Sequence, residues 1–186
     1  MKKGILYFFT GLAGAGKTTL GGMFYEQLRK TSPDAILLDG DRIREKIGDS
    51  CPATGTVLNE ERYTTAARKS GARGLFAHCR DLTEQGRDVV CCSISMYQEI
   101  RDWNRANIAN YKEIYIKVTR ETLYRRDQKK LYSSGAKNVV GVDLPYDEPE
   151  HPDVVVCNDG QETPEAIVSR LMEIFGLASD SRREAS

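Results

Sequence analysis

The chain has 186 residues, and its 27 Lys and Arg balance 27 Asp and Glu, so the formal net charge is zero. This length fits a single domain, and the balanced charge gives no overall field that would attract a nucleic acid polymer or an anionic membrane. No apolar run approaches the roughly 18 residues of a membrane span. The five cysteines form no CxxC pair and lie mostly in apolar runs, which predicts reduced core thiols in a cytoplasmic protein.

Apolar runs of strand length alternate with longer segments of helical period along the chain. The predicted strands cover residues 4–10, 35–39, 87–95, 112–118 and 152–158, and the predicted helices cover residues 17–30, 41–47, 60–86, 97–110, 120–127 and 163–175. Such alternation favours a three-layer α/β fold, in which helices cover both faces of a five-stranded parallel sheet.

Residues 128–152 fit neither period and are rich in Lys, Ser, Gly, Asp and Pro. A loop of this length inside a compact domain is usually functional or disordered. We therefore expect one domain over residues 1–176, with residues 128–152 as a lid segment. The polar end of the chain, residues 177–186, is expected to form a flexible tail.

The first predicted strand leads into the sequence GLAGAGKT, which satisfies the pattern GxxxxGK[ST] at a strand-to-helix junction. Glycines allow backbone N–H groups to turn toward phosphates, and the start of the next helix adds partial positive charge. We expect Lys17 to reach the β- and γ-phosphates of ATP, and the Thr18 hydroxyl to bind Mg²⁺. The predicted ATP-binding residues are Gly11, Ala13, Gly14, Ala15, Gly16, Lys17, Thr18 and Thr19, with Arg126 from the basic segment before the lid.

Two aspartates follow the second predicted strand, in the sequence LLDGDRIR. Asp39 ends the strand and Asp41 opens the next helix, so both are expected at the carboxyl edge of the sheet, where open α/β folds bind ligands. Carboxylates there can bind Mg²⁺ and accept a proton from an acceptor hydroxyl. We predict Asp39 as a metal ligand beside Thr18, and Asp39 or Asp41 as the catalytic base. The alternative for Asp41 is a helix N-cap.

The motifs GLAGAGKTT, LDGDRIR, SISMY, KLY and GVDLPYDEPEHPD follow one another along the chain. In this order and combination they resemble the adenylylsulfate kinase family over residues 4–175. The resemblance implies a P-loop kinase fold, MgATP as donor, the 3′-hydroxyl of adenylyl sulfate as acceptor, and the homodimer usual in that family. It places Ser95 beside Lys17, Asp39 and Asp41 in the catalytic set. The acceptor-binding residues that it implies are Asp41, Arg44, Arg62, Ile94, Ser95, Lys137, Asn138 and Val139.

The chain departs from that family where the adenine of the acceptor would bind. Family members sandwich this base between two phenylalanines, whereas this chain has Val139 at one position and no aromatic residue before Tyr63 at the other. Each missing ring removes about 1–3 kcal/mol of stacking. Arg101 and Arg105, spaced four apart on a predicted helix, are either additional groups for the anionic part of the acceptor or solvated arginines.

Three hypotheses on function stay open. The first is a divergent adenylylsulfate kinase, in which Tyr63 or Tyr97 provides the stacking. The second is a related kinase for a nucleotide with a smaller base, such as cytidine diphosphoramidate in capsule biosynthesis. The third, from a different class, is a regulatory module that binds a nucleotide and transfers nothing.

Overall fold

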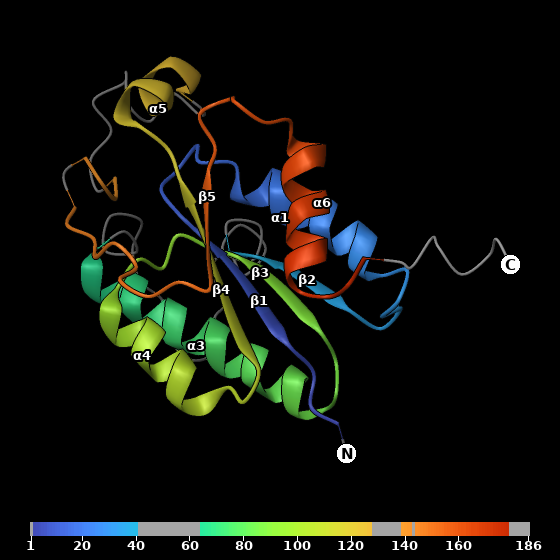
Figure 1. The fold of residues 1–186 in the computed structure, drawn as a ribbon. Helices are drawn as coiled ribbons and strands as arrows, with labels where there is room; N and C mark the ends of the chain where they lie inside the picture. Colours follow the sequence, from blue (N-terminus) through green and yellow to red (C-terminus); the bar gives the residue numbers. More distant parts are fainter. Residues whose placement is uncertain (1, 41–63, 128–138, 143, 179–186) are drawn as a thin grey trace, which may run out of the picture.

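The computed structural model describes residues 2–40, 64–127, 139–142 and 144–178 (Figure 1). Each described element falls on a predicted strand or helix, with ends that differ by a few residues, while the helix predicted over residues 41–47 lies outside the described residues. The strands are β1 Leu6–Thr10, β2 Ile36–Asp39, β3 Val89–Cys92, β4 Tyr111–Lys117 and β5 Val154–Cys157, and the helices are α1 Lys17–Leu28, α3 Thr65–Glu84, α4 Gln98–Asn107, α5 Arg120–Arg126 and α6 Pro164–Ile174.

The five strands form one parallel sheet in the order β2-β3-β1-β4-β5, which confirms the predicted architecture. Because all strands run in the same direction, their carboxyl ends meet at one edge. The loops that follow β1, β3 and β5 therefore begin at the same edge at which β2 ends. In open sheets of this kind, ligands bind at the carboxyl edge.

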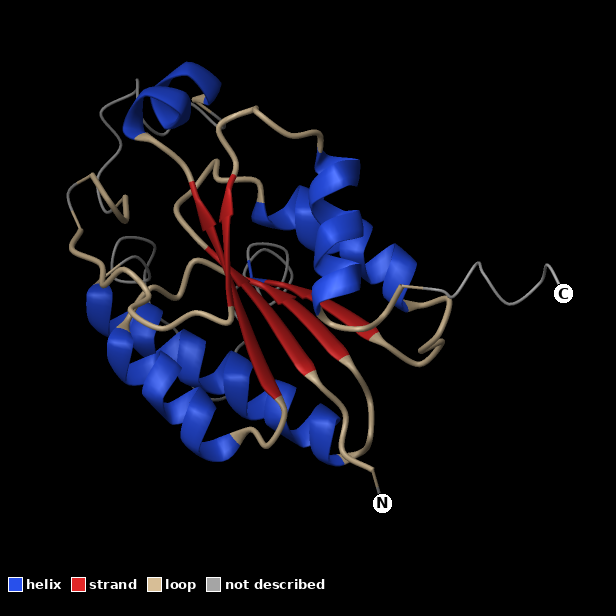
Figure 2. Cartoon of the chain, viewed as in Figure 1, coloured by secondary structure: helices blue, strands red, loops and turns tan. Residues whose placement is uncertain are grey.

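Helices cover both faces of the sheet (Figure 2). Successive side chains of a strand point to opposite faces, so Tyr7 and Phe9 of β1 pack with α1 and α6, whereas Leu6 and Phe8 pack with α3 and α4. All residues of β1 are buried, as expected for a strand covered on both sides. Leu177 packs against the α1/α6 side, and residues 179–186 of the predicted tail lie outside the described residues.

Three cysteines lie in the two cores as free thiols, as predicted: Cys79, Cys91 and Cys92. Burial, with a smaller effect from the charge of Asp39, raises the pKa of Cys92 to about 12. This thiol is therefore protonated at neutral pH and behaves as a small apolar side chain. Cys157 at the end of β5 is free and exposed.

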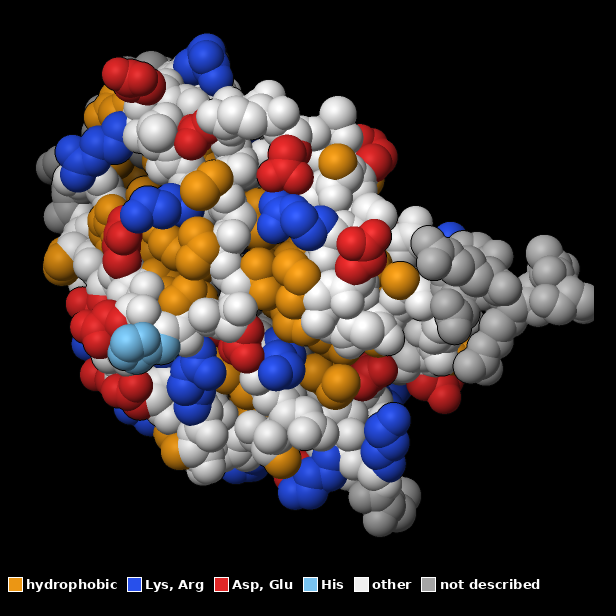
Figure 3. All heavy atoms as spheres, in the orientation of Figure 1, with side chains coloured by type: hydrophobic (Ala, Val, Ile, Leu, Met, Phe, Trp, Pro, Cys, Tyr) orange, Lys and Arg blue, Asp and Glu red, His pale blue; other side chains and the backbone are white. Residues whose placement is uncertain are grey.

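Acidic and basic side chains are interspersed on the face drawn in Figure 3, and neither charge dominates there. This pattern agrees with the balanced composition of the chain. None of the helices in the described ranges has both the length and the apolar character needed to cross a membrane.

Candidate active site

The loop of residues 11–16, here called the phosphate loop, joins β1 to α1 at the carboxyl edge of the sheet. Gly11 and Gly16 adopt φ values of 148° and 101°, which residues with a Cβ rarely adopt. A Cβ on Gly11 would lie only 2.4 Å from the carbonyl oxygen of Ile116, so the loop runs directly against the end of β4. A glycine-rich turn of this shape fits the phosphates of a nucleotide.

The side chains of Asn158 and Arg126 donate hydrogen bonds to backbone carbonyls of the phosphate loop. The Asn158 Nδ2 donates to the carbonyl of Ala15 at 2.8 Å. Arg126 donates from Nη1 to the Gly14 carbonyl at 3.4 Å and from Nη2 to the Asn158 carbonyl at 2.7 Å. Because C=O and N–H of a trans peptide point in opposite directions, fixing the Ala15 carbonyl orients the Gly16 N–H toward the other side of the loop.

The sequence-based prediction included Arg126 but missed Asn158. The signal that could have revealed it is its position directly after β5, at the edge where ligands bind. Gly16 leaves the space that the amide needs, because a Cβ there would lie 2.6 Å from Asn158 Nδ2.

Substituting Asn158 by alanine is expected to weaken ATP binding about five- to tenfold, because one hydrogen bond that orients the phosphate loop is lost. Isothermal titration calorimetry with ATP measures the change without any acceptor. Asn107→Ala is the matched control, since that amide donates to the Trp103 carbonyl within α4. Equal ATP affinities in the two variants would show that Asn158 does not support the loop.

Lys17 is the first residue of α1, and its side chain folds back over the phosphate loop. Its Nζ donates to the carbonyl of Leu12 at 2.8 Å. The first turn of α1 contains no acidic residue, so the partial positive charge of the helix N-terminus adds to that of the lysine. The lysine, the helix terminus and the N–H groups of the loop together favour a phosphate ligand.

Thr18 and Asp39 come together although they lie on different elements. The Thr18 hydroxyl donates to Asp39 Oδ2 at 2.8 Å, and Asp39 at the end of β2 is 8% exposed. A hydroxyl beside a carboxylate fits Mg²⁺, which takes oxygen ligands and is usually held by one or two carboxylates plus the phosphates of the substrate. The structure thus brings together the two residues predicted as metal ligands, and their role in binding metal stays a prediction.

The loop after β3 carries the predicted acceptor residues Ile94 and Ser95. The Ile94 carbonyl accepts a hydrogen bond from the Thr10 hydroxyl at the end of β1. Ser95 has a φ of 31°, a left-handed conformation that costs a non-glycine residue about 1–3 kcal/mol. Its Oγ lies 2.8 Å from that of Ser93. Backbone strain of this kind concentrates at functional sites, which supports the role predicted for Ser95.

Several predicted site residues lie outside the described residues, and their roles stay predictions: Asp41, Arg44, Arg62, Lys137 and Asn138. Val139 is described and is 6% exposed, with its carbonyl accepting the N–H groups of Val142 and Leu144. Tyr97 is 5% exposed and packs in the core beneath α3 and α4. This burial contradicts the hypothesis that the Tyr97 ring stacks on the base of the acceptor.

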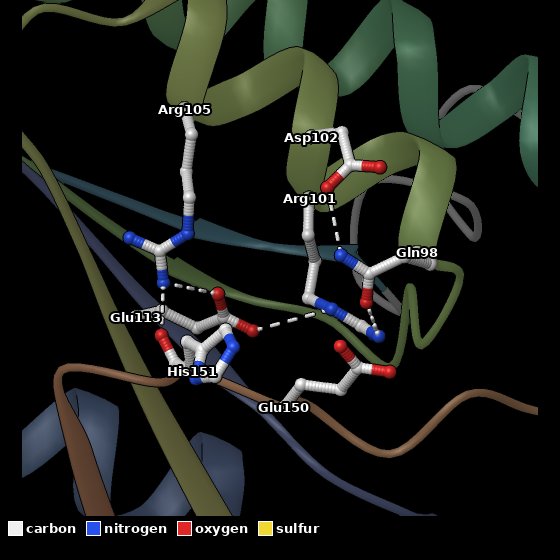
Figure 4. A pocket seen from close by; sticks show the side chains of 7 residues that line it. All are labelled: Gln98, Arg101, Asp102, Arg105, Glu113, Glu150 and His151. Carbon is white, nitrogen blue, oxygen red and sulfur yellow. Dashed lines mark hydrogen bonds and ion pairs between the residues drawn. The ribbon is translucent and has the colours of Figure 1, made fainter.

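Of the two arginines of α4, Arg101 has neither of the roles considered for it, whereas the side chain of Arg105 is 40% exposed. Arg101 is 2% exposed, and Figure 4 shows it lying between Gln98 and Glu113. Its Nη2 donates to Gln98 Oε1 at 2.6 Å, and its Nε lies 3.6 Å from Glu113 Oε1. Arg105 donates to Glu113 Oε2 at 2.9 Å and to the His151 carbonyl at 2.6 Å. Because Arg101 is buried and committed to protein groups, it is neither solvated nor an acceptor ligand.

These groups surround a cavity of about 250 Å³, which is lined by Gln98, Arg101, Asp102, Arg105, Glu113, Glu150 and His151. Burial raises the pKa of Glu113 on β4, and the charges of Arg101 and Arg105 oppose that rise. The buried carboxylate thus needs both arginines, and the arginines attach α4 to β4 and to the segment that leads into β5.

Comparison with known proteins identifies the family. The chain matches the sequence profile of adenylylsulphate kinase over residues 3–157. It is 38% identical over 176 residues to a cytidine diphosphoramidate kinase of Campylobacter jejuni, with 92% of this chain and 96% of that protein covered. It is 33% identical over 179 residues to an adenylyl-sulfate kinase of a Picosynechococcus species, with 94% and 96% covered.

A solved structure shares the fold. The Mycobacterium tuberculosis APS kinase CysC, in complex with AMPPNP and APS, superposes with a TM-score of 0.80 at 24% identity, covering 95% of this chain and 99% of that one. The shared fold agrees with the family that the profile and the relatives indicate. The chain therefore belongs to the adenylylsulphate kinase family of P-loop kinases, and it is a phosphotransferase with a hydroxyl group as acceptor.

Proposed function

We propose that this chain transfers the γ-phosphoryl group of MgATP to a ribose hydroxyl of cytidine diphosphoramidate or a closely similar cytidine nucleotide. The observation that carries the proposal is the loss of both aromatic residues against which the family stacks an adenine, with Val139 in one of those places. A pyrimidine offers less stacking area, so it loses less when the rings are missing. The relative named for this substrate is 38% identical to the chain, and the Picosynechococcus adenylyl-sulfate kinase is 33% identical.

The residues at the carboxyl edge suit phosphoryl transfer, which depends mainly on positioning and charge neutralisation. Lys17 and the start of α1 would hold the β- and γ-phosphates. Thr18 and Asp39 would hold Mg²⁺, which when bound stabilises the charge that develops on the transferring group. Asp39 or Asp41 would accept the proton of the acceptor hydroxyl. Ser95 would contact the acceptor.

Adenylyl sulfate is the second candidate acceptor, with 3′-phosphoadenylyl sulfate as product and sulfate assimilation as the setting. The profile match over residues 3–157 favours it. So do Arg44, Arg62, Lys137 and Asn138, which match acceptor-binding positions of adenylylsulfate kinases. In this case another side chain, such as Tyr63, would replace the missing phenylalanines. A homodimer, as is usual in the family, fits either acceptor.

An assay of ADP release with each acceptor in turn separates the candidates. We expect kcat/KM to be at least about tenfold higher for cytidine diphosphoramidate, because two missing rings weaken adenine binding by about 2–6 kcal/mol. ATP alone gives the background rate. A preference for adenylyl sulfate would establish the second candidate. ADP release that neither acceptor stimulates would contradict both and revive the hypothesis of a regulatory module.

A further inference from the structure

The segment that leads into β5, residues 139–142 and 144–153, is here called the strap. Except for Asp153, it lies in the C-terminal part of the predicted lid, residues 128–152, and it appears in orange in Figure 1. Near its start, Gly141 lies so close to the phosphate loop that a Cβ would be 2.8 Å from the side chain of Leu12. Near its end, the Asp153 carboxylate accepts the backbone N–H of Glu113 at 2.9 Å. The described strap is therefore bonded to the body of the protein.

Asp147 in the middle of the strap makes three separate contacts with the start of α4. Its backbone N–H donates to the Met96 carbonyl at 2.9 Å. Its carboxylate Oδ2 accepts the backbone N–H of Gln98 at 2.9 Å. Its carbonyl accepts Nη1 of the buried Arg101, also at 2.9 Å. One residue thus binds the end of the loop after β3, the first residue of α4 and the buried arginine.

The carboxylate of Asp147 takes the place of a local helix cap. The N-cap residue of α4, Tyr97, makes no side-chain hydrogen bond to the first turn. The N–H groups of a first turn need an acceptor, and a negative charge there is favourable. For Gln98 this acceptor comes from the strap, about fifty residues later in the chain.

The same contacts act on Ser95. The Ser95 carbonyl accepts the N–H of Tyr97 at 2.9 Å, so Ser95, Met96 and Tyr97 form one short turn. Asp147 bonds to this turn at Met96 and to Gln98, the residue that follows the turn. A left-handed, non-glycine conformation persists only where its surroundings fix it from several sides.

We propose that Asp147 is a positioning residue that keeps Ser95 in the conformation in which it binds the acceptor. This inference rests on the proposed role of Ser95 in acceptor binding. Asp147 acts through the backbone of residues 95–98 and does not touch the substrate. Its loss therefore weakens acceptor binding more than ATP binding.

Three variants test this proposal with kinetics. Asp147→Ala is expected to raise the KM for the acceptor about five- to tenfold, the effect of losing a helix cap, with the affinity for ATP unchanged. Asp147→Asn keeps a side-chain oxygen for the Gln98 N–H and should recover most of the loss. Asp153→Ala is the matched control, because that carboxylate also accepts a backbone N–H, from Glu113 on β4, and contacts α4 only through Arg105 in the last turn of the helix. It should leave the KM for the acceptor unchanged.

Amide hydrogen exchange provides a readout that needs no acceptor. In Asp147→Ala, exchange over residues 94–101 is expected to speed up, while exchange over α1 stays as in the wild type. If the wild type phosphorylates neither acceptor, the proposed function fails but the exchange result still tests the contact. Unchanged exchange over residues 94–101 would overturn the inference. Equal losses of affinity for ATP and for the acceptor would also overturn it, because these would indicate a general structural role.

If the alanine variant does not fold, Asp147→Asn is compared with the wild type instead. Wild-type exchange and a wild-type KM for the acceptor in the asparagine variant would support the inference. An equal loss of affinity for both substrates would contradict it.

Discussion

A Lys17→Met variant is expected to lose about 10²–10³-fold in kcat with a largely unchanged melting temperature. The side chain of Lys17 lies over the phosphate loop, where its Nζ contacts the Leu12 carbonyl. Methionine keeps the length and the apolar stem but removes the charge. The transferring phosphoryl group then loses a fixed cation at the place where negative charge develops.

The measurement is steady-state kinetics with the preferred acceptor, combined with thermal unfolding. Lys3→Met is the matched control, because Lys3 forms an exposed ion pair with Glu84, and such pairs contribute little to stability. A kcat for Lys17→Met close to that of the wild type would show that this lysine does not act on the transferring phosphate.

Gly11→Ala is expected to lower the free energy of unfolding by about 2–5 kcal/mol. Two effects add up at this position. The φ of 148° is unfavourable for any residue with a Cβ, and the new methyl group would lie 2.4 Å from the backbone oxygen of Ile116. That oxygen belongs to β4, within the sheet, so it cannot move aside as a flexible side chain would.

Urea denaturation followed by circular dichroism measures this loss. Gly22→Ala provides the control within the same region, because Gly22 lies in α1 and a Cβ there meets no atom within 4 Å. Alanine should stabilise that helix by about 0.5–1 kcal/mol. If both variants changed stability in the same direction, the close approach of the phosphate loop to β4 would be refuted.

The sequence predicts those features that depend on local pattern. The apolar run of β1, LYFFT, is buried on both faces, and the spacing of Gly11, Gly16 and Lys17 fixes a loop between a strand and a helix. The position of Asp39 at the carboxyl edge follows from the end of an apolar run. Parallel strands then bring Asp39 next to Thr18, so this pair could be predicted before any contact was known.

The contacts that sequence does not reveal join segments far apart in the chain. The amide of Asn158 bonds to Ala15 across 143 positions, and Asp147 caps a helix that begins 49 positions earlier. No periodic pattern marks such pairs. The spacing of Arg101 and Arg105 correctly places them together on α4, but whether such a face is solvated or buried depends on the opposite strand. Here β4 presents Glu113 to them.

The stability of the folded protein depends on pH through the carboxyl group of Glu113. Burial raises the pKa of this carboxyl above its ordinary value of 4.5, so between the unfolded and folded pKa values the folded chain binds the proton more tightly than the unfolded chain. The stability contributed by this group is then greatest below the unfolded pKa and falls as the pH rises through the folded pKa. Burial of the ionised carboxylate opposes folding, and the charges of Arg101 and Arg105 offset that effect. The contact between β4 and α4 is therefore a three-charge unit whose members depend on one another, since the loss of one arginine would leave the carboxylate inadequately paired in the protein interior.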